Sequence, residues 1–259
     1  MAGAYTSALL TDAGYSFFVG AIAAIAVSAI IGGLLAWPTK KLRQEYWAIV
    51  TLAAGEILRI FIKTETWLAG GTFGLSAPQP LEHLLPKNLY FLFFVIVGVT
   101  TVVLALFFLN YFTRTPLGRI LRAGREDDDL PRAFGKDLYL SKAKAMIIGG
   151  ALGGLAGCLF AHYMGYISPM SFKPLKTFII WAMVIVGGTG NFLGVIIGTV
   201  CIQIFYNGTR FLSDFLPISM VTISSIRMMV IGLLIIVFML YKPEGILKER
   251  KQTYEIPKD

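Results

Sequence analysis

The sequence is poor in residues that carry out catalysis or bind metals. Its 259 residues include two histidines and two cysteines, which form neither a zinc-binding pattern nor the pattern of a Cys–His nucleophile. There is no GxSxG motif and no phosphate-binding loop of the GxxxxGKS or GxxxxGKT type, since Asp137 follows Gly135 and Lys136. The sequence therefore predicts no enzyme, no metal site and no cofactor bound by this chain. If ATP powers the protein, another subunit hydrolyses it.

Charged residues are also scarce, at 15% of the chain, whereas 56% of the residues are hydrophobic and the mean hydropathy is +0.71. The apolar residues lie in runs of roughly twenty, the length that a helix needs to cross about 30 Å of hydrocarbon. We expect an all-α polytopic membrane protein with a single transmembrane domain over residues 1–259. The seven apolar segments lie at about 17–37, 46–63, 89–112, 143–165, 177–189, 190–206 and 224–241.

The net charge of +8 arises from Lys and Arg residues that mostly lie between the apolar segments. Three segments can be placed on one side of the membrane: the gap at 38–45, the loop at 113–142 with its flank, and the tail after Tyr241. This placement gathers sixteen basic residues on that side and leaves five on the opposite side. Cytoplasmic loops of membrane proteins are enriched in Lys and Arg, so this side is predicted to be cytoplasmic. The charge indicates membrane topology rather than nucleic-acid binding.

Segment 46–63 carries charges that a lipid-facing helix would avoid. Glu56 and Arg59 lie at i and i+3 and share a helix face with Lys63. One interpretation places Glu56 on a polar wall of a translocation path, and the other is an internal ion pair that holds two helices together. Both interpretations remain open.

Two short apolar arms over residues 178–206 are joined by the sequence GGTGN, which ends at Asn191. Gly-interrupted segments are typical of translocation paths, because protein or a water-filled cavity must satisfy the freed backbone groups. This interpretation places Thr189 and Asn191 at the path. The alternative is a tight helical hairpin of two tilted spans.

Two further segments contain glycine-rich patterns. Segment 143–165 has small residues at a spacing that lets another helix approach closely, which predicts a centrally packed helix; its His162 is expected at the membrane interface. The long outer connection 65–88 has a flexible, polar, glycine-rich run around Thr72 and Ser76, where a delivered ligand would arrive. An ordinary capping turn is the alternative for this run.

Residues 113–142 form a charged island in the apolar chain. The apolar spacing from Leu117 to Gly124 predicts a basic amphipathic helix at the cytoplasmic surface. The acidic run 126–129 favours the start of a second short helix, with Pro131 in its first turn and Gly135 at its end. A solvated loop is possible, but the apolar side chains favour docking of a partner. The residues expected at this contact are Leu117, Leu121, Asp129, Leu130, Pro131, Phe134 and Gly135.

The stretch GREDDDLPRAFGKDLYLSKAKAMIIGGALGGLAGCLFAHYMGYISPMSF closely resembles the central region of permease subunits of branched-chain amino acid ABC transporters. LRQEYWAIVTLAAGEILRIF, GGTFGLSAP, MVIVGGTGNFLGVIIGT and YKPEGIL resemble other stretches of that family in the same order, so the resemblance covers nearly the whole chain. The family's cytoplasmic coupling loop has an acidic or apolar residue, two small residues, and Gly six positions after the first. Asp129 and Gly135 fit this pattern, whereas Leu130 and Pro131 occupy the positions at which the family has two small residues.

The resemblance implies an importer in the cytoplasmic membrane of a prokaryote. An extracytoplasmic solute-binding protein would deliver leucine, isoleucine or valine, two homologous permease subunits would form the path, and two cytoplasmic ATPases would bind the coupling loops. Urea or short amides are alternative solutes. A membrane scaffold that recruits an ATPase and a proton-coupled carrier are alternatives of other classes. The resemblance also implies that the family's most N-terminal spans precede the start of this sequence.

Overall fold

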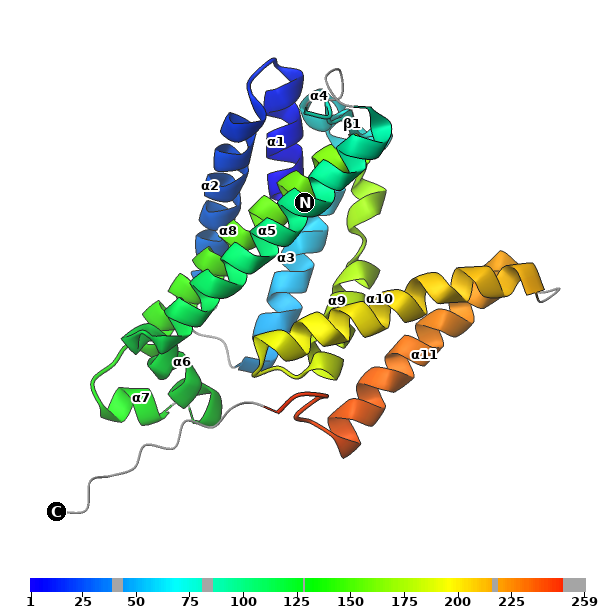
Figure 1. Ribbon diagram of the computed structural model, residues 1–259. Helices are drawn as coiled ribbons and strands as arrows, with labels where there is room; N and C mark the ends of the chain where they lie inside the picture. Colours follow the sequence, from blue (N-terminus) through cyan, green and yellow to red (C-terminus); the bar gives the residue numbers. More distant parts are fainter. Residues whose placement is uncertain (39–43, 81–85, 128, 216–218, 249–259) are drawn as a thin grey trace. The chain divides into compact units, whose positions relative to one another are not determined.

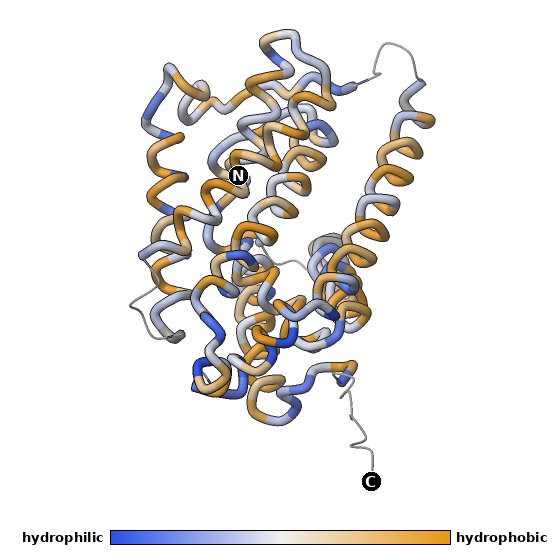
Figure 2. The backbone as a smooth tube through the Cα atoms, turned by 90° about the vertical axis from the view of Figure 1, so that its left-hand side faces the viewer, coloured by the Kyte–Doolittle hydropathy of each residue, from blue (hydrophilic) through white to orange (hydrophobic). Residues whose placement is uncertain are grey.

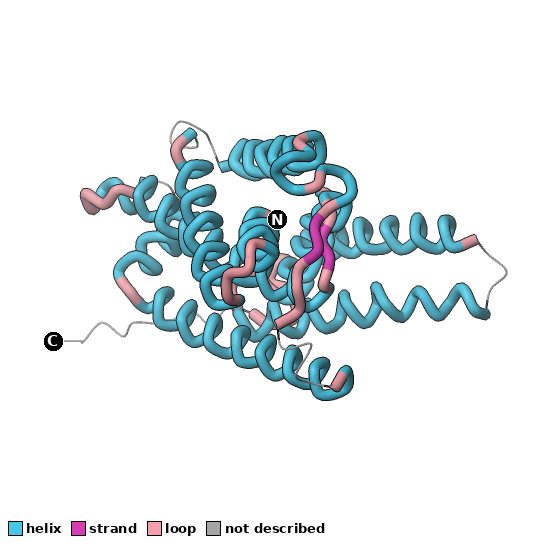
Figure 3. Tube along the Cα trace, turned by 90° about the horizontal axis from the view of Figure 1, so that it is seen from above, coloured by secondary structure: helices cyan, strands magenta, loops and turns pink. Residues whose placement is uncertain are grey.

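The computed structural model describes residues 1–38, 44–80, 86–127, 129–215 and 219–248 (Figure 1). Helices dominate it, and a single pair of two-residue strands is found in the described part (Figure 3). The elements in chain order are α1 (Ala2–Asp12), α2 (Phe17–Ala36), α3 (Gln44–Thr64), α4 (Thr66–Ala69), η2 (Gly71–Phe73), β1 (Leu75–Ser76), α5 (Lys87–Arg114), α6 (Pro116–Glu126), α7 (Asp129–Ala133), α8 (Leu138–Met164), β2 (Tyr166–Ile167), η3 (Pro169–Phe172), α9 (Pro174–Gly187), α10 (Phe192–Phe215) and α11 (Met220–Tyr241).

All seven apolar segments predicted from the sequence form helices, which confirms the all-α polytopic membrane fold. Six described stretches are long and apolar enough to span a membrane, and Figure 2 shows the hydrophobic residues along the long helices. The six are Phe17–Ala36, Leu89–Arg114, Leu138–Met164, Pro169–Gly187, Phe192–Thr209 and Val221–Tyr241. The charges of α3 keep that helix out of this group.

The chain divides into two compact units, of which the first ends at Lys173 and the second begins at Pro174. In the first unit, α1, α2 and α8 pack together (Figure 1). The helix α1 is too short and too polar to appear as an apolar segment in the sequence, yet its Ala4 and Ala8 are completely buried. Tertiary packing, rather than length or hydropathy, therefore stabilises α1.

Glycines allow α2 and α8 to approach closely. A Cβ atom on Gly150 of α8 would lie 2.5 Å from the carbonyl oxygen of Ser28, and one on Gly32 of α2 would lie 2.5 Å from that of Met146. Gly149, the neighbour of Gly150, faces open space. The predicted central packing of α8 is therefore confirmed, with only part of its glycines at the contact.

A hydrophobic cluster packs the connection after α3 against the rest of the first unit. It includes Tyr5 of α1, Ile62 of α3, Ala77 after β1 and Ile167 of β2. The strands β1 and β2 lie side by side (Figure 3). They pair antiparallel, with Leu75 opposite Ile167. The connection after α3 is thereby fastened to the end of α8.

Candidate functional site

The two short helices predicted for the charged island are present as α6 and α7. The side chain of Asp127 accepts a hydrogen bond from the backbone N–H of Asp129 at 2.9 Å and so helps to start α7. After α7, Gly135 adopts a left-handed backbone with φ of +66°, which favours glycine. Asp137 then caps α8 by accepting a hydrogen bond from the N–H of Leu140 at 3.2 Å.

The island is anchored by α6 and exposes α7. Gly124 of α6 lies directly against the side chain of Leu138, so this end of α6 is fixed to the start of α8. The guanidinium of Arg122 donates a hydrogen bond to the carbonyl oxygen of Thr113 at the end of α5. On α7 and just after it, Leu130 is 42% exposed and Phe134 is 78% exposed.

The seven residues predicted at the docking contact differ in exposure. Leu117 and Leu121 are half-buried and Pro131 is buried, so these three shape the island. Leu130 and Phe134 form an exposed apolar pair on the island, and their contact with a partner stays a prediction. Exposed Asp129 is engaged locally, because it forms an ion pair with Arg132 at 3.2 Å.

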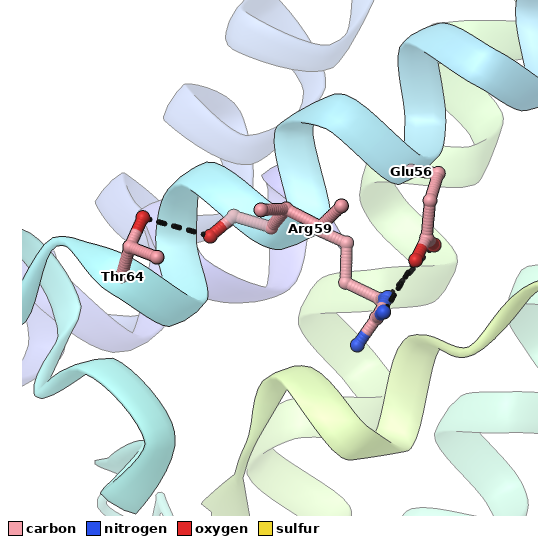
Figure 4. Close-up of polar contacts among 4 residues, drawn as sticks. Glu56, Arg59 and Thr64 are labelled. Atoms are coloured by element: carbon pink, nitrogen blue, oxygen red, sulfur yellow. Dashed lines mark hydrogen bonds and ion pairs between the residues drawn. The ribbon is translucent and has the colours of Figure 1, made fainter.

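The charges of α3 pair within their own helix. The carboxylate of Glu56 accepts a hydrogen bond from Nε of Arg59 at 2.8 Å and forms an ion pair with the same guanidinium (Figure 4). The interpretation that this pair joins two helices is wrong, because both residues belong to α3. The Arg59 side chain is 13% exposed and that of Glu56 is 32% exposed. The alternative, a polar wall along a path, stays a prediction.

The glycine-rich run after α3 adopts a conformation that requires its glycines, and its expected flexibility stays a prediction. Gly70, Gly71 and Gly74 all have left-handed backbones, and a Cβ atom on Gly74 would collide with the carbonyl of Ile167. The N–H of Ala77 donates to the carbonyl oxygen of Gly165 at 2.9 Å. This geometry leaves two predicted ligand-contacting residues, Thr72 of η2 and Ser76 of β1, exposed.

In the second unit, α9 and α10 form the tight hairpin predicted as the alternative to an interrupted path segment. A Cβ atom on Gly187 would collide with the carbonyl of Gly194, so both positions need glycine for the close crossing. The segment after α11 packs on the hairpin tip. There, the N–H of Ile246 donates to the carbonyl oxygen of Val186 at 2.9 Å.

The two hairpin residues predicted at the path have different surroundings. The amide oxygen of Asn191 accepts a hydrogen bond from the N–H of Leu193 at 3.0 Å, and its NH₂ group donates to the carbonyl oxygen of Lys248 at 3.2 Å. Asn191 therefore caps α10 and holds the segment after α11. Thr189 is exposed at the tip. A role for either residue in solute transfer stays a prediction.

His162, expected as a side chain at the membrane interface, is completely buried within the first unit. Its Nδ1 lies 2.9 Å from the carbonyl oxygen of Cys158, and its Nε2 lies 3.3 Å from Oγ1 of Thr11. Phe17 packs edge-on against the ring. The i, i+4 spacing of Cys158 and His162 was visible in the sequence, but the position of Thr11 on α1 was not.

A buried arginine on α11 is a second feature that the sequence analysis missed. Arg227 is 8% exposed, and its guanidinium lies 4.1 Å from the ring centroid of Tyr206. It donates hydrogen bonds to the carbonyl oxygen of Tyr206 at 2.9 Å and to Oγ of Ser224 at 3.0 Å. A single Arg in the apolar 224–241 segment was the available signal, since a charge at membrane depth needs polar partners.

Residues 1–239 match the family model described as branched-chain amino acid transport system / permease component. The high-affinity branched-chain amino acid transport system permease protein LivM of Salmonella typhimurium is 34% identical over 95% of this chain and 61% of its own length. The probable branched-chain amino acid transport permease protein LivM of Methanocaldococcus jannaschii is 32% identical over 85% of this chain and 65% of its own length. The autoinducer 2 import system permease protein LsrC of Salmonella typhi is 25% identical over 73% of this chain and 54% of its own length. No solved structure matches the chain.

Proposed function

The chain belongs to the branched-chain amino acid transport permease family, and from this membership we propose that it is the permease subunit of an ATP-driven importer of leucine, isoleucine and valine. The observation that carries the proposal is the match of residues 1–239 to the family, together with 32–34% identity to proteins named LivM. The importer operates in the cytoplasmic membrane of a prokaryote, with the island and the segment after α11 on the cytoplasmic side.

A separate ATPase supplies the energy by docking on the island. Leu130 and Phe134 support this part of the proposal, because exposed apolar side chains next to a charged surface are typical of a docking contact. The anchoring of α6 to α8 near Leu138 gives a mechanical route from the docked ATPase into a membrane-spanning helix. A second permease subunit and an extracytoplasmic solute-binding protein complete the importer.

Uptake by intact cells tests the substrate. The gene for this chain is deleted in its host, and uptake of radiolabelled leucine, isoleucine and valine at low concentration is compared with that of the same strain carrying the gene on a plasmid. We expect deletion to remove high-affinity uptake and the plasmid to restore it. Unchanged uptake of all three amino acids would refute the substrate assignment. Competition by excess urea or acetamide instead of leucine would favour the amide alternative.

Copurification with the ATPase tests the docking contact. Replacing Phe134 with Ala removes an exposed aromatic side chain without disturbing the packing of α6, and we expect at least about tenfold weaker retention of the ATPase. Arg132→Ala is the matched control, because Arg132 is exposed at the end of α7, two residues before Phe134, and its ion pair with Asp129 lies at the surface. Equal retention by both variants would place the ATPase elsewhere.

A further inference from the structure

One face of α10 is polar although the helix is otherwise apolar and long enough to span a membrane. Thr199, Gln203 and Asn207 follow one another at i, i+4 and i+8, so they lie within a sector of about 80° on one side of the helix. All three are exposed. Since α10 has 24 residues and Gln203 follows Phe192 by 11, Gln203 lies near the middle of the helix, about 17 Å from its start.

The two amide side chains of this face have unused hydrogen-bonding groups. The hydroxyl of Thr199 donates to the carbonyl oxygen of Val195 at 2.7 Å and is therefore satisfied within the helix. In the part of the chain that the structure describes, the side chains of Gln203 and Asn207 make no hydrogen bond. Lipid offers no partner for the amide of Gln203 near the middle of the helix, so this face requires water, solute or a polar protein surface.

The other sides of α10 have different surroundings. Leu193, Val200 and Ile204 are 63%, 51% and 68% exposed, and they form an apolar face suited to lipid. The opposite side is buried, with Ile202 at 2% exposed, where α10 packs with α9 and α11. The polar face is thus a separate sector between an apolar exposed side and a packed side.

We propose that Gln203 and Asn207 line the solute path and contact the charged ends of the amino acid as it crosses the membrane; this inference rests on the proposed function. A zwitterion needs acceptors for its ammonium group and donors for its carboxylate, and each amide supplies both. Neutral amides bind such a solute without holding it as strongly as fixed charges would, which suits transient contact during transfer.

Arg227 makes the surroundings of this face favourable for a carboxylate. Its buried guanidinium stacks on Tyr206, the residue before Asn207, and no carboxylate among the described residues pairs with it. A positive charge in a region of low dielectric acts over a longer distance than one in water. Arg227 therefore acts as a positioning residue for the carboxylate end, through its field rather than by contact.

Cysteine labelling in membrane vesicles that contain the whole importer tests access from water. The background is Cys201→Ala, because Cys201 is exposed on α10, whereas the buried Cys158 is retained. Gln203→Cys and Asn207→Cys are expected to react with a membrane-impermeant methanethiosulfonate, and Ile204→Cys on the apolar face is the control that is expected not to react. Labelling of Ile204→Cys as fast as the other two, or no labelling of those two, would overturn the proposal.

Leucine uptake by Gln203→Leu and Asn207→Leu tests the contact with solute. The leucine side chain introduced at either position is more compatible with the bilayer than the amide that it replaces, so both substitutions favour membrane insertion. We expect each to lower kcat/KM for leucine uptake about tenfold, the effect of one lost hydrogen-bonding partner, while the second permease subunit and the ATPase still copurify. Ile204→Leu is the control and should keep normal uptake.

Two other results would overturn the inference. Normal uptake in both amide variants would mean that this face meets lipid or water without touching solute. Loss of the second permease subunit in the Leu variants would mean that the amides bind a partner helix. These failures are distinct from failure of the proposed function, in which deletion of the whole subunit leaves uptake of leucine, isoleucine and valine unchanged.

Discussion

The contact between α2 and α8 gives a sharp prediction about two adjacent glycines. Gly150→Ala places a methyl group 2.5 Å from the carbonyl oxygen of Ser28, whereas Gly149→Ala places it in open space. Both substitutions lie in the interior of α8 and gain the same intrinsic helix propensity, about 1 kcal/mol. The difference between the two variants therefore measures the contact alone.

The size of the effect follows from the atom that the new methyl group meets. A backbone carbonyl cannot rotate away as a flexible side chain can, so the two helices must separate. Overpacking of this kind costs about 1–3 kcal/mol. We expect Gly149→Ala to be neutral or stabilising by up to about 1 kcal/mol and Gly150→Ala to be about 1–3 kcal/mol less stable than Gly149→Ala.

Thermal stability of the detergent-solubilised importer measures this difference. Both variants are fused to a fluorescent protein, heated in steps and analysed by size-exclusion chromatography. Gly150→Ala should lose its monodisperse peak several degrees below Gly149→Ala. Equal melting of the two variants, or earlier melting of Gly149→Ala, would refute the close approach of α2 and α8 at Gly150.

Three further predictions concern single residues. Gly135→Val should reduce the amount of leucine transported per ATP hydrolysed without reducing membrane insertion, because a β-branched residue in this left-handed position costs about 1–2 kcal/mol. Gly135→Asn should retain coupling, and an equal ratio of transport to hydrolysis in the two variants would refute the role of this turn. Asn191→Ala should lower the free energy of unfolding by about 1–2 kcal/mol, since it removes the cap of α10 and the bond to Lys248; unchanged thermal stability would contradict this. Tyr5→Phe should be neutral or stabilising by about 1 kcal/mol in the same assay, because the buried hydroxyl has no hydrogen-bond partner among the described residues; a clear loss would show that it has one.

The features predicted correctly from the sequence are those that local patterns determine. Length and hydropathy predict the long helices, and the spacing from Leu117 together with the turn residues Pro131 and Gly135 predicts the two helices of the island. The glycine-rich junction allowed either an interrupted path segment or the α9–α10 hairpin, and the close crossing of the hairpin depends on Gly194 within α10 as well as on the junction itself.

Other features depend on contacts between distant segments. The helix α1 buries Tyr5 only because α8 and the connection after α3 surround it, and His162 is buried only because Thr11 and Phe17 lie against it. The spacing of Glu56 and Arg59 placed them on one face but did not show that they pair with each other. In α10, the i, i+4, i+8 spacing of Thr199, Gln203 and Asn207 was visible in the sequence. The structure adds that the helix sectors on either side of them are apolar or packed.

Transport by the purified importer tests the central claim most directly, namely that this chain couples hydrolysis of ATP by another subunit to the movement of branched-chain amino acids. The complex of this chain with its partner permease and ATPases is reconstituted into liposomes with the solute-binding protein on the outside and ATP inside. We expect leucine to accumulate only with ATP, at the same rate when an uncoupler removes the proton gradient. Accumulation that follows the proton gradient and ignores ATP, or none of leucine, isoleucine or valine, would contradict the account.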